Sequence, residues 1–229
     1  MRDRIQHVLT HFLADGLAAL LLIALSCILL LISHDVSWLG ASRRLFNGVA
    51  TTPSLKGWVS EIDRAARLLK QGMVVLDLGA APGAWSQYAR RQVGRNGRVL
   101  ATDILPMDAL PGVEFVQGDF REQSVLDRLK LELADGVDVL LSDMAPNLSG
   151  MDAMDAPRSM YLAELALELT GLVLKPGGVA LIKLLQGAGF QEFVASARRE
   201  FKKIKLLKPQ ASRSRSPETY LLASGRRMV

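Results

Sequence analysis

The chain has 229 residues, a formal net charge of +5 and 49% hydrophobic residues. This length suffices for one α/β domain with a substantial core. The single cysteine, Cys27, excludes an intrachain disulfide and a cysteine metal cluster. All three histidines precede residue 35, away from the motifs below, so we expect neither histidine-based catalysis nor a bound metal.

Residues 16–33 form an eighteen-residue stretch without a charged side chain. Such a stretch reaches the lower limit of about 17–18 residues for a membrane-spanning helix, and it is long for a signal-peptide core. We expect either an uncleaved membrane anchor or an apolar helix that needs a partner; a buried helix of a soluble protein is the alternative. Residues 34–56 are expected to be a connector, so the predicted boundary separates residues 1–56 from a catalytic domain, 57–229.

Strands and helices alternate after this connector. An amphipathic helix is expected over 61–69 and is closed by Gly72. Strands are expected at 74–78, 98–102, 113–117, 137–142 and 179–184, and helices at 85–93, 124–133, 157–174 and 190–201. Segments 203–208 and 219–223 are expected to pair at a sheet edge. The alternation predicts an α/β fold with a mostly parallel sheet and helices on both faces.

Four acids stand at or near the carboxyl ends of predicted strands: Asp77, Asp103, Asp119 and Asp143. One such acid is ordinary, because helices favour Asp as an N-cap. Four acids in one sheet indicate a site, because ligands of open α/β sheets bind outside those strand ends. Asp103 is suitably placed to accept hydrogen bonds from ribose hydroxyls, and Asp119 to reach an adenine amino group.

A loop of very small residues, 79–83, follows the first predicted strand. Glycine and alanine there allow a ligand to approach the backbone closely. The loop is neither a G-x-G-x-x-G fingerprint nor a P-loop, and it has no lysine for phosphates. It therefore suits a nucleotide ligand that lacks a pyrophosphate, such as S-adenosylmethionine.

Several motifs together resemble the FtsJ family of 23S ribosomal RNA (uridine-2'-O-) methyltransferases. They are Asp77 to Gln87, Gln117 to Arg121, Ser142 to Asn147, Arg158 to Tyr161, Leu174 to Gly178, Lys183 to Gly187 and Ser212 to Glu218. The resemblance implies a Rossmann-like, S-adenosylmethionine-dependent methyltransferase fold. It also implies a cytoplasmic, monomeric enzyme that methylates a ribose 2'-hydroxyl of 23S rRNA in the large ribosomal subunit.

The resemblance further implies which residues form the site. The cofactor-binding residues would be Gly83, Trp85, Asp103, Asp119 and Asp143. Three members of the family's K-D-K-E catalytic tetrad would be Asp143, Lys183 and Glu218. A ribose hydroxyl is a poor nucleophile and needs a base or a strong hydrogen-bond partner. We expect Lys183 to take the proton or steer the hydroxyl oxygen, with Asp143 orienting Lys183 and Glu218 setting its charge. The alternative without a catalytic role is that Lys183 and Glu218 only face solvent.

One tetrad member and the basic N-terminal arm of the family do not match. Counting back without a gap places Trp58 at the first tetrad lysine, and the nearest lysine is Lys56. Two other functions therefore stay open: a cofactor- and RNA-binding protein with weak catalysis, and a membrane-anchored methyltransferase with another substrate. Basic residues near the C-terminus either form an RNA-facing strip or face solvent; they are Arg198, Arg199, Lys202, Lys203 and Lys205.

Overall fold

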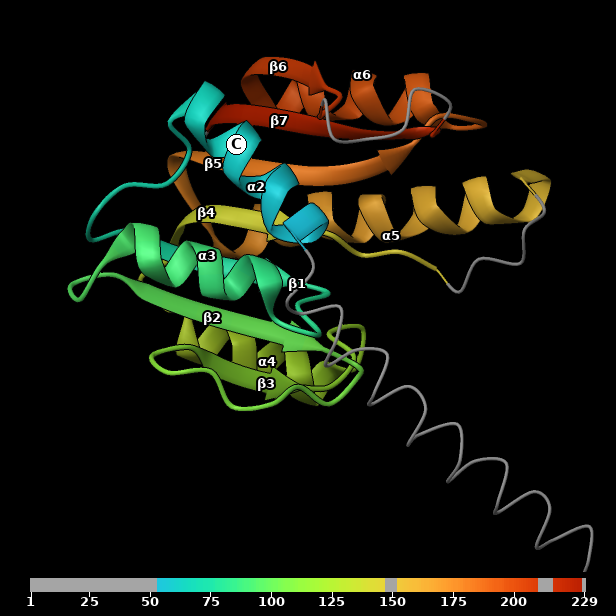
Figure 1. Cartoon of the computed structure of the whole chain (residues 1–229). Coiled ribbons are helices and arrows are strands. Elements are labelled where there is room, and N and C mark those ends of the chain that lie inside the picture. Colours follow the sequence, from blue (N-terminus) through green and yellow to red (C-terminus); the bar gives the residue numbers. More distant parts are fainter. Residues whose placement is uncertain (1–52, 147–151, 210–215, 228–229) are drawn as a thin grey trace, which may run out of the picture. The chain divides into compact units, whose positions relative to one another are not determined.

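The structure is a computed structural model that describes residues 53–146, 152–209 and 216–227 (Figure 1). The predicted apolar helix at 16–33 lies outside these residues, so the membrane anchor and the boundary before residue 57 stay predictions. Within the described ranges, no helix is both long and apolar enough to cross a membrane.

A seven-stranded sheet has the strand order β3-β2-β1-β4-β5-β7-β6. Its strands are β1 Val74–Leu78, β2 Arg98–Asp103, β3 Glu114–Gln117, β4 Val137–Ser142, β5 Leu174–Leu185, β6 Phe201–Leu207 and β7 Glu218–Arg226. β7 runs antiparallel to both of its neighbours, β5 and β6, while the pairs among β1 to β5 are parallel. The mostly parallel sheet predicted from the alternation is confirmed.

Helices cover both faces of this sheet (Figure 1). They are α2 Pro53–Ala66, α3 Ala84–Val93, α4 Gln123–Glu132, α5 Asp152–Val173 and α6 Phe190–Glu200. Val59 of α2 and Ala89 of α3 belong to one hydrophobic core. Leu129 of α4, Ala166 of α5 and Phe193 of α6 belong to the core on the other face. The two cores explain why both faces of the central strands are buried and why their sequences are continuously apolar.

The starts of three elements differ from the prediction by about five residues or more. α2 begins at Pro53 and not at Glu61, so it extends into the predicted connector. α5 begins at Asp152, which leaves Pro157 inside the helix and not at its start, where its missing N–H costs nothing. β5 begins at Leu174, directly after α5, because the glycine-containing stretch predicted only as a helix stop also joins the strand, with a register shift against β4.

Candidate active site

The strand order changes direction between β1 and β4. β1 to β3 extend one way across the sheet, and β4 and β5 extend the other way. Open α/β sheets bind ligands outside the carboxyl ends of the strands at such a switch point. The backbone N–H of Asp143, just after β4, donates to the carbonyl of Leu78 at 3.2 Å. Asp143 is thereby held beside the small-residue turn that follows β1.

Two glycines shape this turn. Gly79 has φ 71° and Gly83 has φ 100°, both in the left-handed region. A Cβ at Gly83 would lie 2.5 Å from Cδ1 of Leu110, and a Cβ at Gly79 would lie 2.8 Å from Cγ of Met144. Side chains are therefore excluded on steric as well as conformational grounds. The turn leads directly into α3, whose first backbone N–H groups face the same edge.

Asp103, at the end of β2, holds the turn in place. Its carboxylate accepts the backbone N–H of Ala81 at 2.9 Å and that of Leu105 at 2.8 Å. Partial burial raises the pKa of the Asp103 carboxyl, although these hydrogen bonds oppose the shift. Asp103 thus joins two loops at the carboxyl edge of the sheet.

Asp119 lies next to the end of β2, since the backbone N–H of Gly118 donates to the Asp103 carbonyl at 2.9 Å. Its carboxylate forms an ion pair with Arg121, with Nη2 and Oδ2 2.5 Å apart. Hydrogen bonds from Arg121 lower the pKa of the Asp119 carboxyl. The Asp119 side chain is therefore ionised and already has one guanidinium partner.

Asp77 is the most deeply buried acid of the edge, with 1% of its surface exposed. The Ser86 hydroxyl donates to its Oδ2 at 2.5 Å, while its buried Oδ1 has no hydrogen-bond partner among the described residues. Burial raises the pKa of Asp77 to about 7, against the effect of the Ser86 hydrogen bond, and the charges of Asp143 and Asp103 add to the rise. The sequence placed Asp77 at this edge but assigned it no role.

Lys183 and Asp143 form an ion pair between β5 and the end of β4. Nζ of Lys183 lies 3.0 Å from Oδ1 of Asp143 and donates to its backbone carbonyl at 2.9 Å. The Tyr220 hydroxyl, opposite Lys183 on β7, donates to the same Oδ1 at 3.2 Å. Burial raises the pKa of Tyr220 strongly, and the charge of Asp143 adds to the rise. The phenol therefore stays protonated and acts as a donor.

Tyr220 is held between two indole rings. Trp85 lies 5.7 Å away between ring centroids, at 34°, and Trp58 lies 6.2 Å away, edge-on at 68°. Trp85 is buried, with 3% of its surface exposed, so its ring supports Tyr220 from within the core. Trp58, at the position predicted for the first tetrad lysine, also reaches this edge of the sheet from α2. Lys56 lies in the same helix, and its side chain is outside the described residues.

Glu218 begins β7, two residues before Tyr220 and opposite Leu185. Its side chain therefore lies on the same sheet face as Tyr220 and Lys183. Its carboxylate accepts the Ser216 hydroxyl at 3.2 Å. Within the described chain, Glu218 forms no ion pair with Lys183.

The structure thus brings most predicted site residues to one edge and adds two that sequence reasoning missed, Ser86 and Tyr220. The period of two along β7 from Glu218 could have indicated Tyr220. The predicted basic strip is divided between the two faces. Ile204 packs in the α4–α6 core and Leu207 in the α2–α3 core, so strand alternation separates Lys202 from Lys203 and Lys205.

Comparisons with known proteins agree with this geometry. Residues 59–226 match the family model described as FtsJ-like methyltransferase. A "Ribosomal RNA large subunit methyltransferase E" of Xanthomonas oryzae is 57% identical over 171 residues, which cover 74% of this chain and 81% of that protein. A protein of the same name from Legionella pneumophila is 56% identical over 168 residues, covering 73% of this chain and 82% of the relative.

Solved structures show the same fold. A ribosomal RNA methyltransferase structure from Plasmodium falciparum superimposes with a TM-score of 0.67 at 25% identity, covering 77% of this chain and 97% of that one. The fibrillarin of Aeropyrum pernix, solved with natively bound S-adenosyl-L-methionine, superimposes with a TM-score of 0.52 at 14% identity, covering 74% of this chain and 73% of that one.

Proposed function

The chain belongs to the FtsJ-like methyltransferase family, and on this premise we propose that it methylates the ribose 2'-hydroxyl of a uridine in 23S rRNA. The methyl donor is S-adenosylmethionine, and the substrate is the rRNA of the large ribosomal subunit. The enzyme acts as a monomer in the cytoplasm. The single observation that carries the proposal is the Lys183–Asp143 ion pair beside the small-residue turn. The names of the relatives support ribosomal RNA of the large subunit as the substrate class.

The charge of the edge fits S-adenosylmethionine, which carries a sulfonium and an ammonium group. Asp77, Asp103 and Asp143 meet there, and Lys183 is the one cation paired with them in the described part of the chain. The Oδ1 of Asp77 is buried without a hydrogen-bond partner among the described residues, and its carboxyl adds to the acidic character of the edge. Met144 lies too close to Gly79, and Leu110 too close to Gly83, for either residue to carry a Cβ. The turn is therefore restricted to backbone at these two positions. When bound, the cofactor supplies an electrophilic methyl group.

Each cofactor-binding residue has a role that its surroundings allow. Gly83 and the backbone at Trp85, at the start of α3, would line the cofactor, while the Trp85 ring holds Tyr220. Asp103 would accept ribose hydroxyls with its remaining lone pairs. Asp119, ionised by its pairing with Arg121, would accept the adenine amino group. Asp143 would contact the cofactor and, through Oδ1, fix Lys183.

Lys183 is the catalytic group of the proposal. An ammonium has three N–H donors, and two of the Lys183 donors are directed to the oxygens of Asp143. The third is available to hold the ribose hydroxyl oxygen in line with the methyl group. In its amine form, Lys183 instead presents a lone pair, which accepts the hydroxyl proton as the oxygen–carbon bond forms and the bond between the methyl group and sulfur breaks. Glu218 lies on the same sheet face as Lys183, two residues before Tyr220 on β7.

The variant Lys183→Ala tests this assignment. We expect methyl transfer to 23S rRNA to fall by about 100-fold or more, because positioned acid–base groups contribute roughly 10²–10⁴ in rate, while S-adenosylmethionine still binds. Lys175→Ala is the matched control, since Lys175 lies at the other end of β5 and pairs with Asp138 at 3.0 Å. Transfer at the wild-type rate in Lys183→Ala would refute the role of Lys183.

A further inference from the structure

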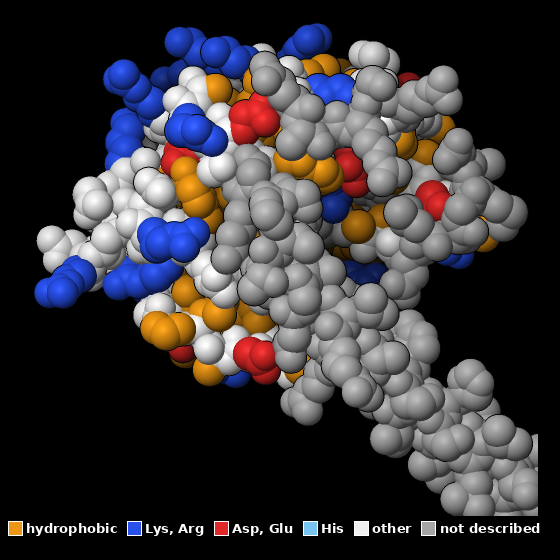
Figure 2. Space-filling view, viewed as in Figure 1, with side chains coloured by type: hydrophobic (Ala, Val, Ile, Leu, Met, Phe, Trp, Pro, Cys, Tyr) orange, Lys and Arg blue, Asp and Glu red, His pale blue; other side chains and the backbone are white. Residues whose placement is uncertain are grey.

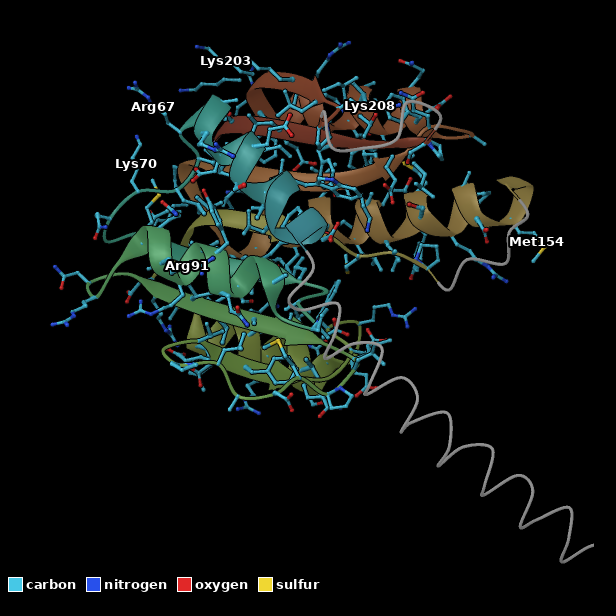
Figure 3. The ribbon with its side chains drawn as sticks, viewed as in Figure 1. Arg67, Lys70, Arg91, Met154, Lys203 and Lys208 are labelled. Atoms are coloured by element: carbon cyan, nitrogen blue, oxygen red, sulfur yellow. The ribbon has the colours of Figure 1, made fainter. Side chains whose placement is uncertain are left out.

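We propose that five basic residues on the α2–α3 side of the sheet form a second RNA-binding surface, away from the catalytic edge. The residues of this distal basic surface are Arg67, Lys70, Arg91 and Lys203, which Figure 3 labels, together with Lys205. The inference rests on the proposed function, because it assigns the surface to rRNA segments other than the one that carries the target uridine.

The helical part of this surface is assembled where α2 and α3 end. The Tyr88 hydroxyl of α3 donates to Oδ2 of Asp63 of α2 at 2.9 Å, which fixes the two helices side by side. Arg67 and Arg91 each follow this contact by about one helical turn. The backbone N–H of Gly72 donates to the carbonyl of Val93 at 2.8 Å, so the segment after Lys70 also lies against the end of α3.

The strand part comes from β6, at the edge of the sheet. Leu207 packs in the core that contains α2 and α3. Lys205 and Lys203 precede it at intervals of two residues, so their side chains project from the same face of β6. In the register with β7, Lys203 lies opposite Ser224 and Lys205 opposite Leu222. Because β6 has no partner on its outer side in the described sheet, its lysines border open solvent.

All five side chains are exposed, and none forms an ion pair with another described residue. Figure 2 shows the resulting concentration of Lys and Arg along one side of the molecule. The acid of α2 closest to this surface, Asp63, is buried and accepts the backbone N–H of Leu69 at 2.8 Å. A surface of unpaired cations without exposed acids among them suits a polyanion.

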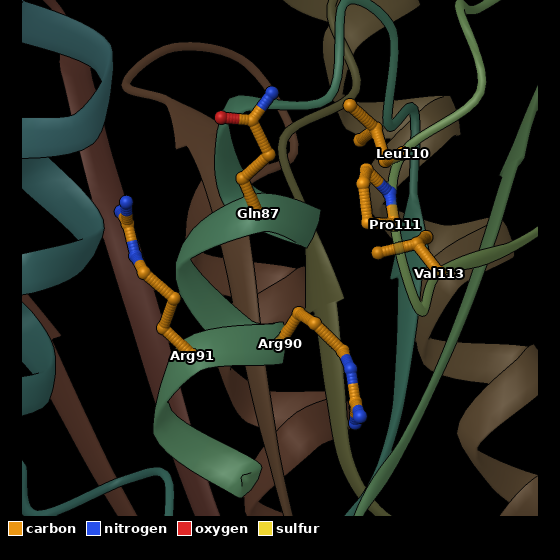
Figure 4. Close-up of a pocket in the computed structure, with 6 residues that line it drawn as sticks. All are labelled: Gln87, Arg90, Arg91, Leu110, Pro111 and Val113. Atoms are coloured by element: carbon orange, nitrogen blue, oxygen red, sulfur yellow. The ribbon is translucent and has the colours of Figure 1, made fainter. Parts of the chain in front are cut away.

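A groove beside Arg91 favours RNA over a lipid surface. The groove has a volume of about 350 Å³ and lies between α3 and the loop after β2 (Figure 4). Leu110, Pro111 and Val113 form one wall, and Gln87, Arg90 and Arg91 form the other. The Arg90 guanidinium donates to the carbonyls of Gly94 and Gly97, and the Arg91 side chain points away from the apolar wall (Figure 4). The apolar wall beside Gln87 can accept an unstacked nucleobase, which single-stranded RNA offers and a phospholipid headgroup does not.

The backbone at Arg67 supports a functional rather than a structural origin of this surface. Arg67 has φ 51° and is the only non-glycine residue with positive φ in the described chain. Its N–H donates to the Asp63 carbonyl at 2.6 Å, which is the helix-ending geometry that favours glycine. An arginine at this position carries conformational strain that a glycine would avoid, and it places a charged side chain where the helix ends.

Along the strands, the surface is displaced from Lys183 toward the beginning of β5. Lys203 of β6 pairs with Ser224 of β7, and Ser224 pairs with Val179 of β5. Lys183 comes later on β5 than Val179 and pairs with Tyr220. A target nucleotide at Lys183 and an RNA segment at Arg67 would therefore be separated by most of the length of α2. An RNA must therefore extend several nucleotides beyond the target uridine to contact both.

The test uses a triple variant of the full chain, Lys70→Gln, Arg91→Gln and Lys203→Gln. The matched control is Arg128→Gln, Lys130→Gln and Arg198→Gln, which removes three exposed charges from α4 and α6 on the other face. Methyl transfer is measured on unmethylated large ribosomal subunits and on an RNA fragment of roughly three nucleotides centred on the target uridine, which at about 3.4 Å per stacked nucleotide is too short to reach Arg67 from Lys183.

We expect the triple variant to raise KM for subunits about 10-fold or more while kcat and activity on the short fragment stay within about twofold. The salt dependence of subunit binding should weaken by about 2 in log–log slope, since each single-strand phosphate contact contributes about 0.7. An equal rise in KM in the control variant, or an unchanged KM in the triple variant, would overturn the proposal. So would loss of binding to phosphatidylglycerol vesicles with an unchanged KM, because it would assign the surface to a membrane.

A failure of the proposed function would look different. Wild-type protein would then methylate neither substrate, while filter binding of the same subunits would still report on the distal basic surface. Arg67→Gly gives an independent readout, because it should leave the melting temperature unchanged or raised while it weakens subunit binding about threefold or more. Unchanged subunit binding in Arg67→Gly would contradict the place of Arg67 in the surface.

Discussion

Lys183 and Tyr220 face each other across the antiparallel β5–β7 pair, and both reach the same carboxylate oxygen of Asp143: Nζ of Lys183 forms an ion pair with Oδ1 at 3.0 Å, and the Tyr220 hydroxyl donates to it at 3.2 Å. Lys183 and Tyr220 lie on strands that are far apart in the sequence and become neighbours by pairing in the sheet. Asp143 lies in the loop after β4. This arrangement fixes the direction of the Asp143 side chain and, with it, the third N–H of Lys183. Variants of these groups should therefore affect rate more than cofactor affinity.

Tyr220→Phe removes the hydroxyl and keeps the ring between Trp58 and Trp85. We expect stability to fall by about 0.5–1.5 kcal/mol, the net value of one hydrogen bond, and kcat to fall about tenfold, because Asp143 loses one of its two side-chain donors. The matched control is Tyr88→Phe, which removes a similar hydrogen bond to Asp63, at 2.9 Å, outside the site. Equal kcat losses in both variants would show a global rather than a local effect.

Trp58→Lys introduces a second cation where the family has its first tetrad lysine. The Trp58 ring contacts Tyr220, which donates to Asp143, so an ammonium there would support the ionised carboxylate. We expect single-turnover methyl transfer at saturating S-adenosylmethionine to rise by about 10-fold or more, a typical share for one positioned group. Trp58→Met is the uncharged control, and it also measures the loss of the ring contact. An unchanged rate would mean that this chain does not require the cation.

Asp77 makes stability depend on pH near neutrality. Its folded pKa is about 7, against 3.8 for the ordinary group, so the folded state holds a proton that the unfolded state has already lost. The free energy of unfolding therefore decreases as the pH rises from about 4 to about 7, by up to about 4 kcal/mol. Asp77→Asn should abolish this decrease in urea unfolding at pH 5, 6 and 7. A variant that follows the wild-type pH profile would place the pKa of Asp77 outside this range.

Gly83→Ala tests the bare backbone of the turn. A Cβ there would lie 2.5 Å from Leu110 and 2.9 Å from Met107, and φ is 100°. We expect a stability loss above the 1–2 kcal/mol or so of left-handed strain alone, together with weaker S-adenosylmethionine binding in calorimetry. Gly72→Ala separates the two causes, because Gly72 has φ 82° but nothing within 4 Å of its Cβ position. Equal effects of the two substitutions would exclude a steric contribution at Gly83.

The sequence by itself determined the order of the elements, the strand ends and the acids that follow them. Val74 to Leu78 and Val137 to Ser142 are apolar runs whose ends are marked by local residues, so Asp77, Asp103 and Asp143 could be placed at one edge without coordinates. The spacing of hydrophobic residues and the residue types in turns are local properties, so they can be identified from the sequence alone. The start of α2 was not predictable in this way, because the packing of Val59 against the core extends the helix beyond its own periodic signal.

Only the tertiary structure decided which side chains contact one another through hydrogen bonds, ion pairs and ring packing. The antiparallel insertion of β7 between β5 and β6 places Tyr220 opposite Lys183, and strand register is set by packing over the whole sheet. The same packing buries Trp85, turns Trp58 toward Tyr220 and raises the pKa of Asp77 by desolvation. It also assigns Lys203 to the α2–α3 face and Lys202 to the other. Burial and cross-strand pairing are collective properties, so they arise only when the chain has folded.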